Sequence, residues 1–388
     1  MAEMTDAAAR PQKKKRRRLL VAGGFDMPFL ILVLVLLAVG LICMFSASYV
    51  YAYYNDGDSY FYIKKQMIFA LIGVAAMLAA SCLDYHFWHR IAIPLMAVSV
   101  VLLIVVRVMP ASNGIHRWIR LPGIGQFQPS EVAKFAMILL FAHLISLNQD
   151  RMKSFKVGFL PFIVTLILVA FLVIIEPHLS GTILIVGIGL VMMFVGGTRP
   201  LYLGVTLAGG LGAVYYMVAV KHYEYDRIEV WLHPFESFAG ELRNKAWQTV
   251  QSLYAIGSGG LLGQGLGSSR QKHLFLPEPQ NDFVFAVVCE ELGFVGAVII
   301  ILLFAVLIWR GFVIGFKAKD KFGSLLAIGL TAQIGLQVML NLAVVSNLFP
   351  NTGISLPFFS YGGTSLVMLL GQMGIVLSVS RGLQKKTL

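Results

Sequence analysis

Residues 27–47 read MPFLILVLVLLAVGLICMFSA, a run of 21 residues that contains no charged side chain. The hydrocarbon core of a bilayer is about 30 Å thick, and a helix needs about 20 apolar residues to cross it. The run meets that length and therefore predicts a transmembrane helix. It is too long for the apolar part of a signal peptide and no convincing cleavage site follows it, so we expect it to be retained.

The same pattern recurs along the whole chain. Ten segments have the apolar length expected of a membrane span: residues 27–47, 66–83, 91–109, 129–147, 159–175, 181–196, 201–220, 283–309, 324–346 and 365–380. Hydrophobic residues make up 58% of the chain and charged residues only 13%, whereas soluble domains carry about 25% charged residues. These figures exclude a soluble multidomain protein and a disordered chain. The sequence predicts an all-α polytopic membrane protein with about ten transmembrane helices.

The distribution of charge predicts which end faces the cytoplasm. The net charge is +12, from 31 Lys and Arg against 19 Asp and Glu, and six of these basic residues form the run 13–18. A basic run beside a span is typical of a cytoplasmic segment and can attract anionic lipid headgroups, so we favour this over a nucleic-acid-binding tract. With the N-terminus inside, 19 of the 31 basic residues lie in cytoplasmic segments. An even number of spans then places both termini in the cytoplasm.

Three parts are expected along the chain: a basic cytoplasmic tail (1–25), a membrane domain (26–382) and a second cytoplasmic tail (383–388). Between the seventh and eighth spans, residues 221–282 form a large extracellular loop, and loops this long are usually functional. Its glycine-rich stretch 257–267 lacks the preceding strand of a dinucleotide site. We interpret that stretch as a tightly turned loop whose N–H groups could face an anion.

Charged residues at or inside spans are informative, because a charge at the bilayer centre costs about 2.5–3.5 kcal/mol and usually faces a partner in a cavity. Four polar clusters meet this description: residues 114–122 with 128–134, 176–182, 276–282 with 290–291, and 351–365. In the predicted topology all four lie at the outer face, beside the large extracellular loop. This pattern predicts a protein that handles an amphiphile, with its charged head outside and its tail in the lipid.

The first cluster contains a predicted helix start and a charge pair. Pro129 is typical of a first helical turn, and Glu131 and Lys134 are three residues apart, so they can pair on one face of that helix. The alternative is an ion pair that only snorkels at the helix end. Trp118, beside Arg117, could equally be an aromatic anchor at the membrane interface.

The other clusters also have ordinary structural alternatives. The second cluster, residues 176–182, could be a simple turn between helices. In the third, Asp282 stands at an expected helix N-terminus, where capping is the ordinary role of a carboxylate. Capping cannot explain Glu290 and Glu291, which lie two turns further into the span, so we expect at least one of them to line a polar cavity. The fourth, residues 351–365, must be buried in protein or line water; a structural re-entrant turn is the alternative.

Four motifs stand in a fixed order along the chain: Gly114-x-x-Arg117-Trp118-Ile119, Gln128-Pro-Ser-Glu-x-x-Lys134, Pro277-Glu-x-x-x-Asp282-Phe283 with Glu290-Glu291-Leu-Gly293, and Leu356-Pro-Phe-x-Ser360-Tyr-Gly-Gly363. Together they resemble the SEDS family (shape, elongation, division and sporulation), which includes FtsW, RodA and SpoVE. The resemblance runs from about residue 25 to residue 382 and is closer to the FtsW/SpoVE branch than to RodA. Two positions depart from it: Gln280-Asn281 replaces a common His-Thr, and His178 replaces a common Asp.

This resemblance implies a peptidoglycan glycosyltransferase that polymerises lipid II at the outer face of the bacterial cytoplasmic membrane, during cell division or sporulation. It implies a class B penicillin-binding protein as transpeptidase partner, divisome proteins, and a location at the septum. A divalent cation, Mg²⁺ or Mn²⁺, is a candidate cofactor, and no organic cofactor or nucleic-acid partner is expected. The implied catalytic residues are Asp282, Lys134 and Glu131, and the implied substrate-binding residues are Arg117, Trp118, Glu278, Ser360, Gly362 and Gly363.

Two questions stay open on the residues alone. Asp282 can be the base that takes a proton from a sugar hydroxyl or a ligand of the divalent cation, while Arg117 and Lys134 are candidates for stabilising a pyrophosphate leaving group. The same cavity could serve a lipid II flippase, which predicts charges at the bilayer midplane, or a non-catalytic division scaffold. The ionisable residues gather at the outer edge, which favours polymerisation over flipping.

Overall fold

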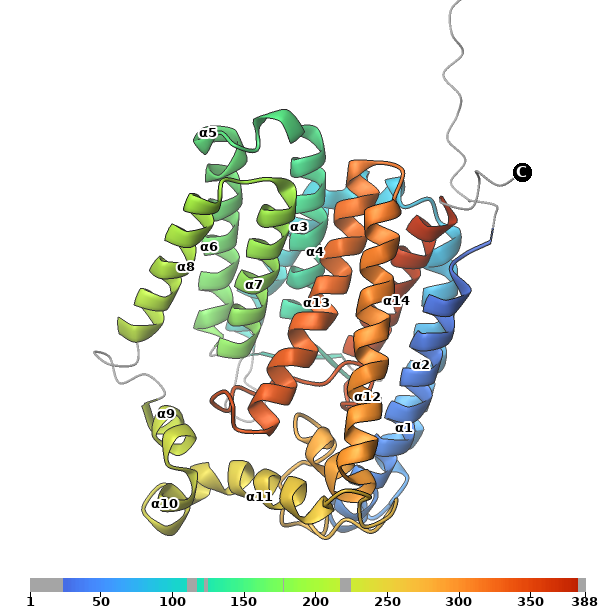
Figure 1. Ribbon diagram of the computed structural model, residues 1–388, viewed down its shortest axis with the longest axis vertical. Coiled ribbons are helices and arrows are strands. Elements are labelled where there is room, and N and C mark those ends of the chain that lie inside the picture. Colours follow the sequence, from blue (N-terminus) through green and yellow to red (C-terminus); the bar gives the residue numbers. More distant parts are fainter. Residues whose placement is uncertain (1–23, 110–116, 122–124, 177, 217–224, 383–388) are drawn as a thin grey trace, which may run out of the picture.

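The computed structural model describes residues 24–109, 117–121, 125–176, 178–216 and 225–382. Ten apolar helices dominate this part of the chain (Figure 1): α1 (Met27–Asp56), α2 (Phe61–Cys82), α3 (His86–Val108), α4 (Pro129–Leu147), α6 (Leu160–Ile175), α7 (Leu179–Gly196), α8 (Pro200–Tyr215), α12 (Val284–Lys317), α13 (Lys321–Val345) and α14 (Gly363–Arg381). Short elements connect them: β1 (Ile119–Leu121), β2 (Gly125–Phe127), η1 (Gln149–Arg151), α5 (Phe155–Gly158), α9 (Tyr225–Leu232), α10 (Pro234–Ala239) and α11 (Arg243–Gly259). β1 and β2 form an antiparallel hairpin.

These helices match the ten predicted spans, and the prediction of a multi-span helical membrane protein is confirmed. Within the described ranges, nine helices are long and apolar enough to cross a membrane, with α5 and α6 counted as one. The predicted span 201–220 corresponds to α8, which has 16 residues and ends just before residues outside the described part. α12 has 34 residues and is longer than predicted, because its last turns continue past the apolar run to Lys317.

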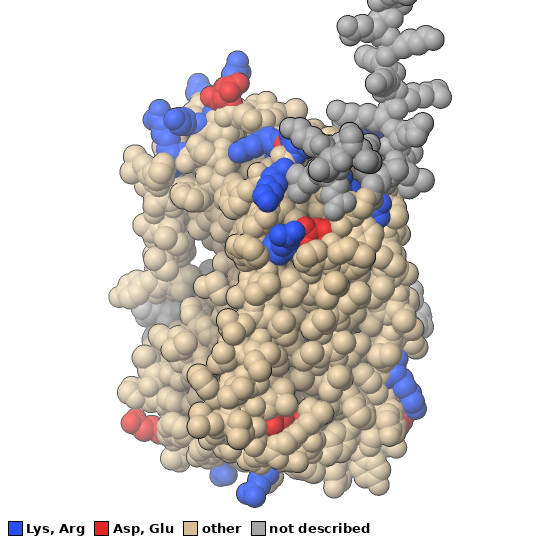
Figure 2. Space-filling model, turned by 45° about the vertical axis from the view of Figure 1, so that its right-hand side comes forward, with Lys and Arg blue, Asp and Glu red and all other residues tan. Residues whose placement is uncertain are grey.

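The two ends of the bundle differ as the charge distribution predicts. α1 begins and α14 ends at the upper end in Figure 1, whereas α9, α10 and α11 lie across the lower end. The upper end also carries α5, with the basic residues Arg151, Lys153 and Lys156 around it. On the face shown in Figure 2, charged side chains gather towards both ends, and a broad uncharged band separates them. By the positive-inside rule the upper end is the predicted cytoplasmic end and the lower end the predicted outer end; the basic run 13–18 lies outside the described residues.

Five helices begin at the outer end, because the chain alternates direction: α2, α4, α7, α12 and α14. Among them α2 packs against α14, α4 against α7, and α12 against α14. A helix N-terminus has unpaired N–H groups and a partial positive charge. The outer end of the bundle therefore collects several such termini in one region.

Residues 346–362 connect α13 and α14 without regular structure and lie inside the protein. Phe358 and Phe359 are 2% and 0% exposed. Gly40 of α1 makes room for them, since a Cβ there would lie 2.4 Å from the carbonyl oxygen of Phe358. Irregular backbone at membrane depth is stable only when protein or water surrounds it. The prediction that the fourth cluster is buried in protein or lines water is confirmed.

α12 breaks at Gly293, whose φ of 66° and ψ of −169° are not helical. The segment 260–265 supplies hydrogen-bond partners for the backbone groups exposed at this break. Phe294 N–H donates to the carbonyl of Gly260 at 2.9 Å, and Gln264 N–H donates to the carbonyl of Glu290 at 3.0 Å. The glycine-rich stretch contains a tight turn, as predicted. Its Gln264 N–H group, however, binds a carbonyl of the broken helix and is not presented to an anion.

Replacing Gly293 with alanine should destabilise the protein. The added Cβ would lie 2.2 Å from the backbone nitrogen of Gly263, and backbone conformations of this kind cost about 1–3 kcal/mol for other residues. We expect a lower midpoint of thermal unfolding for the detergent-solubilised protein. Gly371→Ala in α14 is the matched control, because no atom lies within 4 Å of its Cβ position. An unchanged midpoint for Gly293→Ala would contradict this account of the break.

Candidate active site

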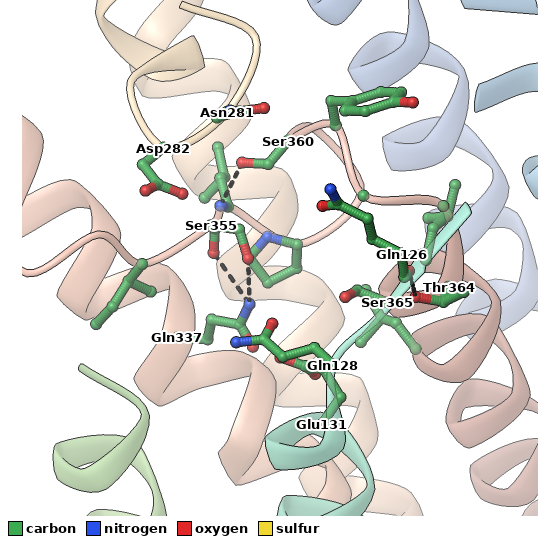
Figure 3. A pocket seen from close by; sticks show the side chains of 18 of the residues that line it. Gln126, Gln128, Glu131, Asn281, Asp282, Gln337, Ser355, Ser360, Thr364 and Ser365 are labelled. Atoms are coloured by element: carbon green, nitrogen blue, oxygen red, sulfur yellow. Dashed lines mark hydrogen bonds between the residues drawn. The ribbon is translucent and has the colours of Figure 1, made fainter. Parts of the chain in front are cut away.

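A cavity of about 1110 Å³, lined by both polar and apolar side chains, lies at the outer end, among the starts of the five helices. All nine residues predicted for the site line it: Asp282, Glu131, Lys134, Arg117, Trp118, Glu278, Ser360, Gly362 and Gly363. In Figure 3, Asp282 enters from the loop before α12, Glu131 from the start of α4 and Thr364 from the start of α14. The fold therefore brings four sequence-distant motifs to one cavity.

Asp282 faces the cavity and does not cap α12. The N-cap position is Phe283, and no side chain makes a capping hydrogen bond there, so the interpretation of Asp282 as an N-cap is wrong. Its backbone is fixed by Asn341, whose Nδ2 donates to the Asp282 carbonyl oxygen at 2.8 Å. Its Oδ2 lies beside Gly353, where a Cβ would stand 3.1 Å from that oxygen. A side chain larger than hydrogen at Gly353 would crowd the carboxylate.

Asp282 binds its proton more tightly in this environment than an aspartate side chain does in water. Burial raises the pKa of Asp282 to about 6; the Glu278 carboxylate adds to this rise and Arg117 opposes it. Glu278 is oriented by Asn281, whose Nδ2 donates to its carboxylate at 2.8 Å. A general base works best when its pKa lies near the operating pH. Asp282 is therefore suited to proton abstraction near neutral pH.

Glu131 and Lys134 form the predicted ion pair, with 2.6 Å between Lys134 Nζ and Glu131 Oε1. α4 begins at Pro129, as predicted. The Lys134 side chain is only 4% exposed, whereas a snorkelling lysine extends its ammonium group to the interface. The snorkelling alternative is therefore wrong: the pair lines the cavity.

Arg117 is held against the second cluster. Its Nε donates to the carbonyl oxygen of Glu176 at 3.1 Å. Glu176 is 1% exposed, and among the described residues neither of its carboxylate oxygens has a hydrogen-bond partner. Burial raises the pKa of Glu176 to about 8, although Arg117 and Arg107 oppose the rise. This carboxyl group is therefore mostly protonated at neutral pH.

His178 and Ser180 place the second cluster in the cavity wall. The Nδ1 atom of His178 lies 3.4 Å from Gln128 Nε2 and from Ser130 Oγ. Burial, with Arg117 and Lys134 adding to its effect, lowers the pKa of His178 to about 3, so the ring is neutral. The interpretation of this cluster as a simple turn between helices is too narrow, because it also shapes the site.

The last motif is fastened to α2 and to the loop before α12. Gln66 of α2 donates through Nε2 to the carbonyl of Ser360 and accepts from Gly362 N–H, both at 3.3 Å. Tyr361 N–H donates to the carbonyl of Gln280 at 2.8 Å. The hydroxyl oxygen of Ser360 accepts from the Leu356 N–H at 2.7 Å. Part of the bonding capacity of Ser360 is therefore used to shape the motif itself.

Several cavity residues are absent from the sequence-based predictions. Gln333 of α13 and Gln372 of α14 line the cavity at 1% and 4% exposure, and their Oε1 atoms have no hydrogen-bond partner within the described residues. Gln337 donates to the carbonyl of Ser355 at 3.0 Å. Lys65 of α2 also lines the cavity. The sequence feature that could have identified these residues is an amide or a charge within or beside an apolar run. Such a group is costly to bury without a hydrogen-bond partner, so its presence indicates a polar cavity wall or a partner.

Glu290 and Glu291 do not line this cavity, so the expectation for them is not met here. They hold the loop that ends at Asp282. The Glu290 carboxylate accepts from Arg270 N–H at 2.9 Å. Glu291 pairs with Lys272 at 2.6 Å and accepts from Ser46 of α1. Because Lys272 is 0% exposed and Glu291 2% exposed, these charges anchor the loop inside the protein.

The fold and the cavity define a class of protein: a multi-pass helical membrane protein with a carboxylate-bearing cavity at its outer face. Residues 27–385 match the model of the FtsW/RodA/SpoVE cell cycle proteins. The chain belongs to this family, and the resemblance predicted from the four motifs is confirmed.

Relatives match almost the whole chain. Stage V sporulation protein E of Bacillus subtilis is 43% identical over 362 residues, which cover 92% of this chain and 97% of the relative. A protein of Trichlorobacter lovleyi named probable peptidoglycan glycosyltransferase FtsW is 39% identical over 366 residues, covering 93% and 94%. A chain of a peptidoglycan synthase complex superposes with a TM-score of 0.75 at 25% identity, covering 93% of this chain and 99% of that one. RodA of Thermus thermophilus superposes with a TM-score of 0.68 at 27% identity, covering 92% and 97%.

Lys272→Met should destabilise the protein strongly. It would leave the buried Glu291 without its ammonium partner, and removing one member of a buried pair costs about 3–5 kcal/mol. The double variant Lys272→Met/Glu291→Gln should recover much of this loss, because both charges are then absent. Thermal unfolding in detergent measures the effect. Lys64→Met is the control, since its pair with Asp58 is exposed and such pairs contribute little. Wild-type unfolding of Lys272→Met would show that this pair does not hold the loop.

Proposed function

We propose that this protein is a peptidoglycan glycosyltransferase that polymerises lipid II at the outer face of the cytoplasmic membrane. The observation that carries the proposal is the Asp282 carboxylate, which faces an outer cavity together with the cations Arg117 and Lys134. The names of the relatives support the same activity. The cavity, at about 1110 Å³, exceeds the roughly 300–1,000 Å³ of ordinary ligand pockets, as a disaccharide-pyrophosphate headgroup requires.

Asp282 is the proposed general base. One lipid-linked disaccharide offers its GlcNAc 4-hydroxyl, and the growing chain offers C1 of a MurNAc that is joined through pyrophosphate to undecaprenol. The O–H bond breaks and its proton goes to the Asp282 carboxylate, while the oxygen forms a bond to C1 with inversion. The C1–O bond to the pyrophosphate breaks at the same centre, and undecaprenyl pyrophosphate leaves. The pKa of Asp282, about 6, supports this role.

Arg117 and Lys134 are proposed to stabilise the leaving pyrophosphate. Negative charge grows on that group in the transition state, and fixed cations in a water-poor site stabilise it strongly. The 2.6 Å contact with Glu131 fixes the position of the Lys134 ammonium. The N-termini of α4 and α7 add partial positive charge at the same place. Trp118 lines the same cavity and offers an apolar surface to a sugar ring.

A divalent cation, Mg²⁺ or Mn²⁺, is proposed as an additional component. The described residues contain no group of three or more His, Cys, Asp or Glu side chains placed to hold a metal ion. Mg²⁺, however, is often bound by one or two carboxylates together with substrate phosphates. As the alternative to its role as base, Asp282 would hold the cation here together with Glu278. It would neutralise charge on the pyrophosphate.

A class B penicillin-binding protein and divisome proteins are the proposed partners, and the septum the proposed location. One structural neighbour belongs to a complex that coordinates polymerisation and crosslinking, which supports a transpeptidase partner. Peptidoglycan strands made at the outer face require a crosslinking enzyme on that same face. The outer elements α9, α10 and α11 lie where such an enzyme could reach them (Figure 1).

Polymerisation explains the cavity better than lipid flipping. A flippase must carry a charged headgroup past the bilayer midplane, where transporters place their binding sites. The described charged residues of the cavity belong to the first two turns of α2 and α4 and to outer loops. Near the middle of α13 and of α14 the cavity is lined by the uncharged amides of Gln333 and Gln372. The charge distribution supports chemistry at the outer face.

Asp282→Asn should reduce the initial rate of lipid II polymerisation by purified protein at least 100-fold, because a positioned general base contributes about 10²–10⁴. The change preserves shape, so thermal unfolding should stay within the wild-type range. Glu236→Gln serves as control, since that side chain is 83% exposed. Polymerisation at the wild-type rate by Asp282→Asn would overturn the assignment.

Glu278→Gln should shift the acidic limb of the pH–rate profile to lower pH. Asp282 must lose its proton to act as base, so activity falls as the pH drops through about 6. Glu278 raises the pKa of Asp282, and its removal therefore lowers that pKa. Polymerisation rates between pH 4.5 and 8 measure the shift. A limb that stays in place, or moves to higher pH, would contradict the proposed coupling of these carboxylates.

A further inference from the structure

Three cations line the described part of the cavity: Lys65 of α2, Arg117 and Lys134 of α4. Lys65 is the one that has no polar partner among the described residues. Lys134 pairs with Glu131, and Arg117 donates to the carbonyl of Glu176. Among the described residues, Lys65 makes no hydrogen bond or ion pair. Its ammonium group lies over the ring of Phe61, 3.6 Å from the ring centre. All its N–H donors therefore remain available to a ligand.

The position of Lys65 is specific to one face of α2. Tyr62, Lys65 and Phe69 follow one another at intervals of three and four residues, and all line the cavity, as residues on one helix face do. Lys64, the next residue in the chain, does not line it and pairs with Asp58 at 2.8 Å. The two adjacent lysines therefore face different surroundings.

An apolar wall lies deeper in the bundle than Lys65. It consists of Ile68 and Phe69 of α2 with Leu366 and Leu369 of α14, and the two helices pack closely along their length. Ile68 is one helical turn deeper in the bundle than Lys65, and it remains 58% exposed. Ile72, one further turn along α2, is 50% exposed. An apolar path therefore leads from the cavity along α2 towards the bilayer.

We propose that Lys65 and this apolar wall form a second binding position for a polyprenyl pyrophosphate, on the side of the cavity formed by α2 and α14. The ammonium group of Lys65 binds the pyrophosphate, and the polyprenyl chain follows Ile68 and Ile72 into the lipid. The position is that of the acceptor, the lipid II molecule that supplies the attacking hydroxyl. Arg117, before β1, and Lys134 of α4 hold the donor pyrophosphate. This inference rests on the proposed function.

Two pyrophosphates in one cavity repel each other, so separate cations, here on different elements, are required to hold both. The bond to the acceptor pyrophosphate does not break in the reaction. Lys65 therefore binds the ground state and the transition state equally, and such contacts affect KM more than kcat. Arg117 and Lys134, which face the leaving pyrophosphate, affect kcat. The two binding positions are thus distinguishable by kinetics.

The kinetic test compares Lys65→Met with Lys64→Met and Lys65→Arg in purified full-length protein. Initial rates of glycan formation are measured against lipid II concentration. Lys65→Met should raise KM for lipid II about tenfold, the effect of one lost charge-assisted contact, with kcat changed less than threefold. Lys64→Met should match wild type, and Lys65→Arg should restore most of the affinity. An unchanged KM in Lys65→Met, or an equal rise in Lys64→Met, would overturn the proposal.

A binding experiment separates this inference from the proposed function. Native mass spectrometry counts lipid II molecules bound to the Asp282→Asn chain, which needs no turnover. We expect two bound molecules per chain, and the second should bind about tenfold more weakly after Lys65→Met is added. A single molecule on Asp282→Asn, or an unchanged affinity for the second molecule in the double variant, overturns the second position. Failure of the wild type to polymerise lipid II would instead overturn the proposed function, whatever the number of bound molecules.

Discussion

The structure depends on one constraint: backbone polar groups at membrane depth must be paired within the protein. α12 breaks at Gly293, and the segment 260–265 supplies the missing partners. The same loop is then fixed by the buried pair of Lys272 and Glu291 and ends at Asp282, whose carbonyl binds Asn341. The position of the carboxylate is therefore a consequence of how the membrane-embedded backbone is satisfied. A flexible outer loop could not hold a base steadily in a cavity.

The cavity balances its charges before any ligand enters. Its described acidic groups, Glu131, Glu278 and Asp282, are matched in number by the cations Lys65, Arg117 and Lys134. Asp282 is partly protonated near neutral pH, since its pKa is about 6. The starts of five helices add partial positive charge. The cavity is therefore weakly positive, which suits a dianionic pyrophosphate that must enter, react and leave again.

Much of this arrangement could be predicted from the sequence, because apolar length and charge position are local signals. The ten spans, the pair of Glu131 and Lys134 and the burial of residues 351–365 all follow from such signals. Asp282 was harder, since a carboxylate before a helix has the same local pattern whether it caps or faces a cavity. The roles of Glu290 and Glu291 depend on a loop that folds back from residues 269–272. No sequence spacing indicates that contact.

The depth of the two lysines connects the architecture to the proposed reaction. Lys65 is the fifth residue of α2 and Lys134 the sixth residue of α4, and both helices begin at the outer end. At 1.5 Å per residue, each lies about 6–8 Å along its helix. Asp282 stands just before the start of a third helix, α12. Two lipid-anchored headgroups held by these lysines share one level, because their tails enter the same leaflet. The reacting hydroxyl and C1 must then meet farther from the bilayer than the pyrophosphates, at the level where an outer loop can place a base.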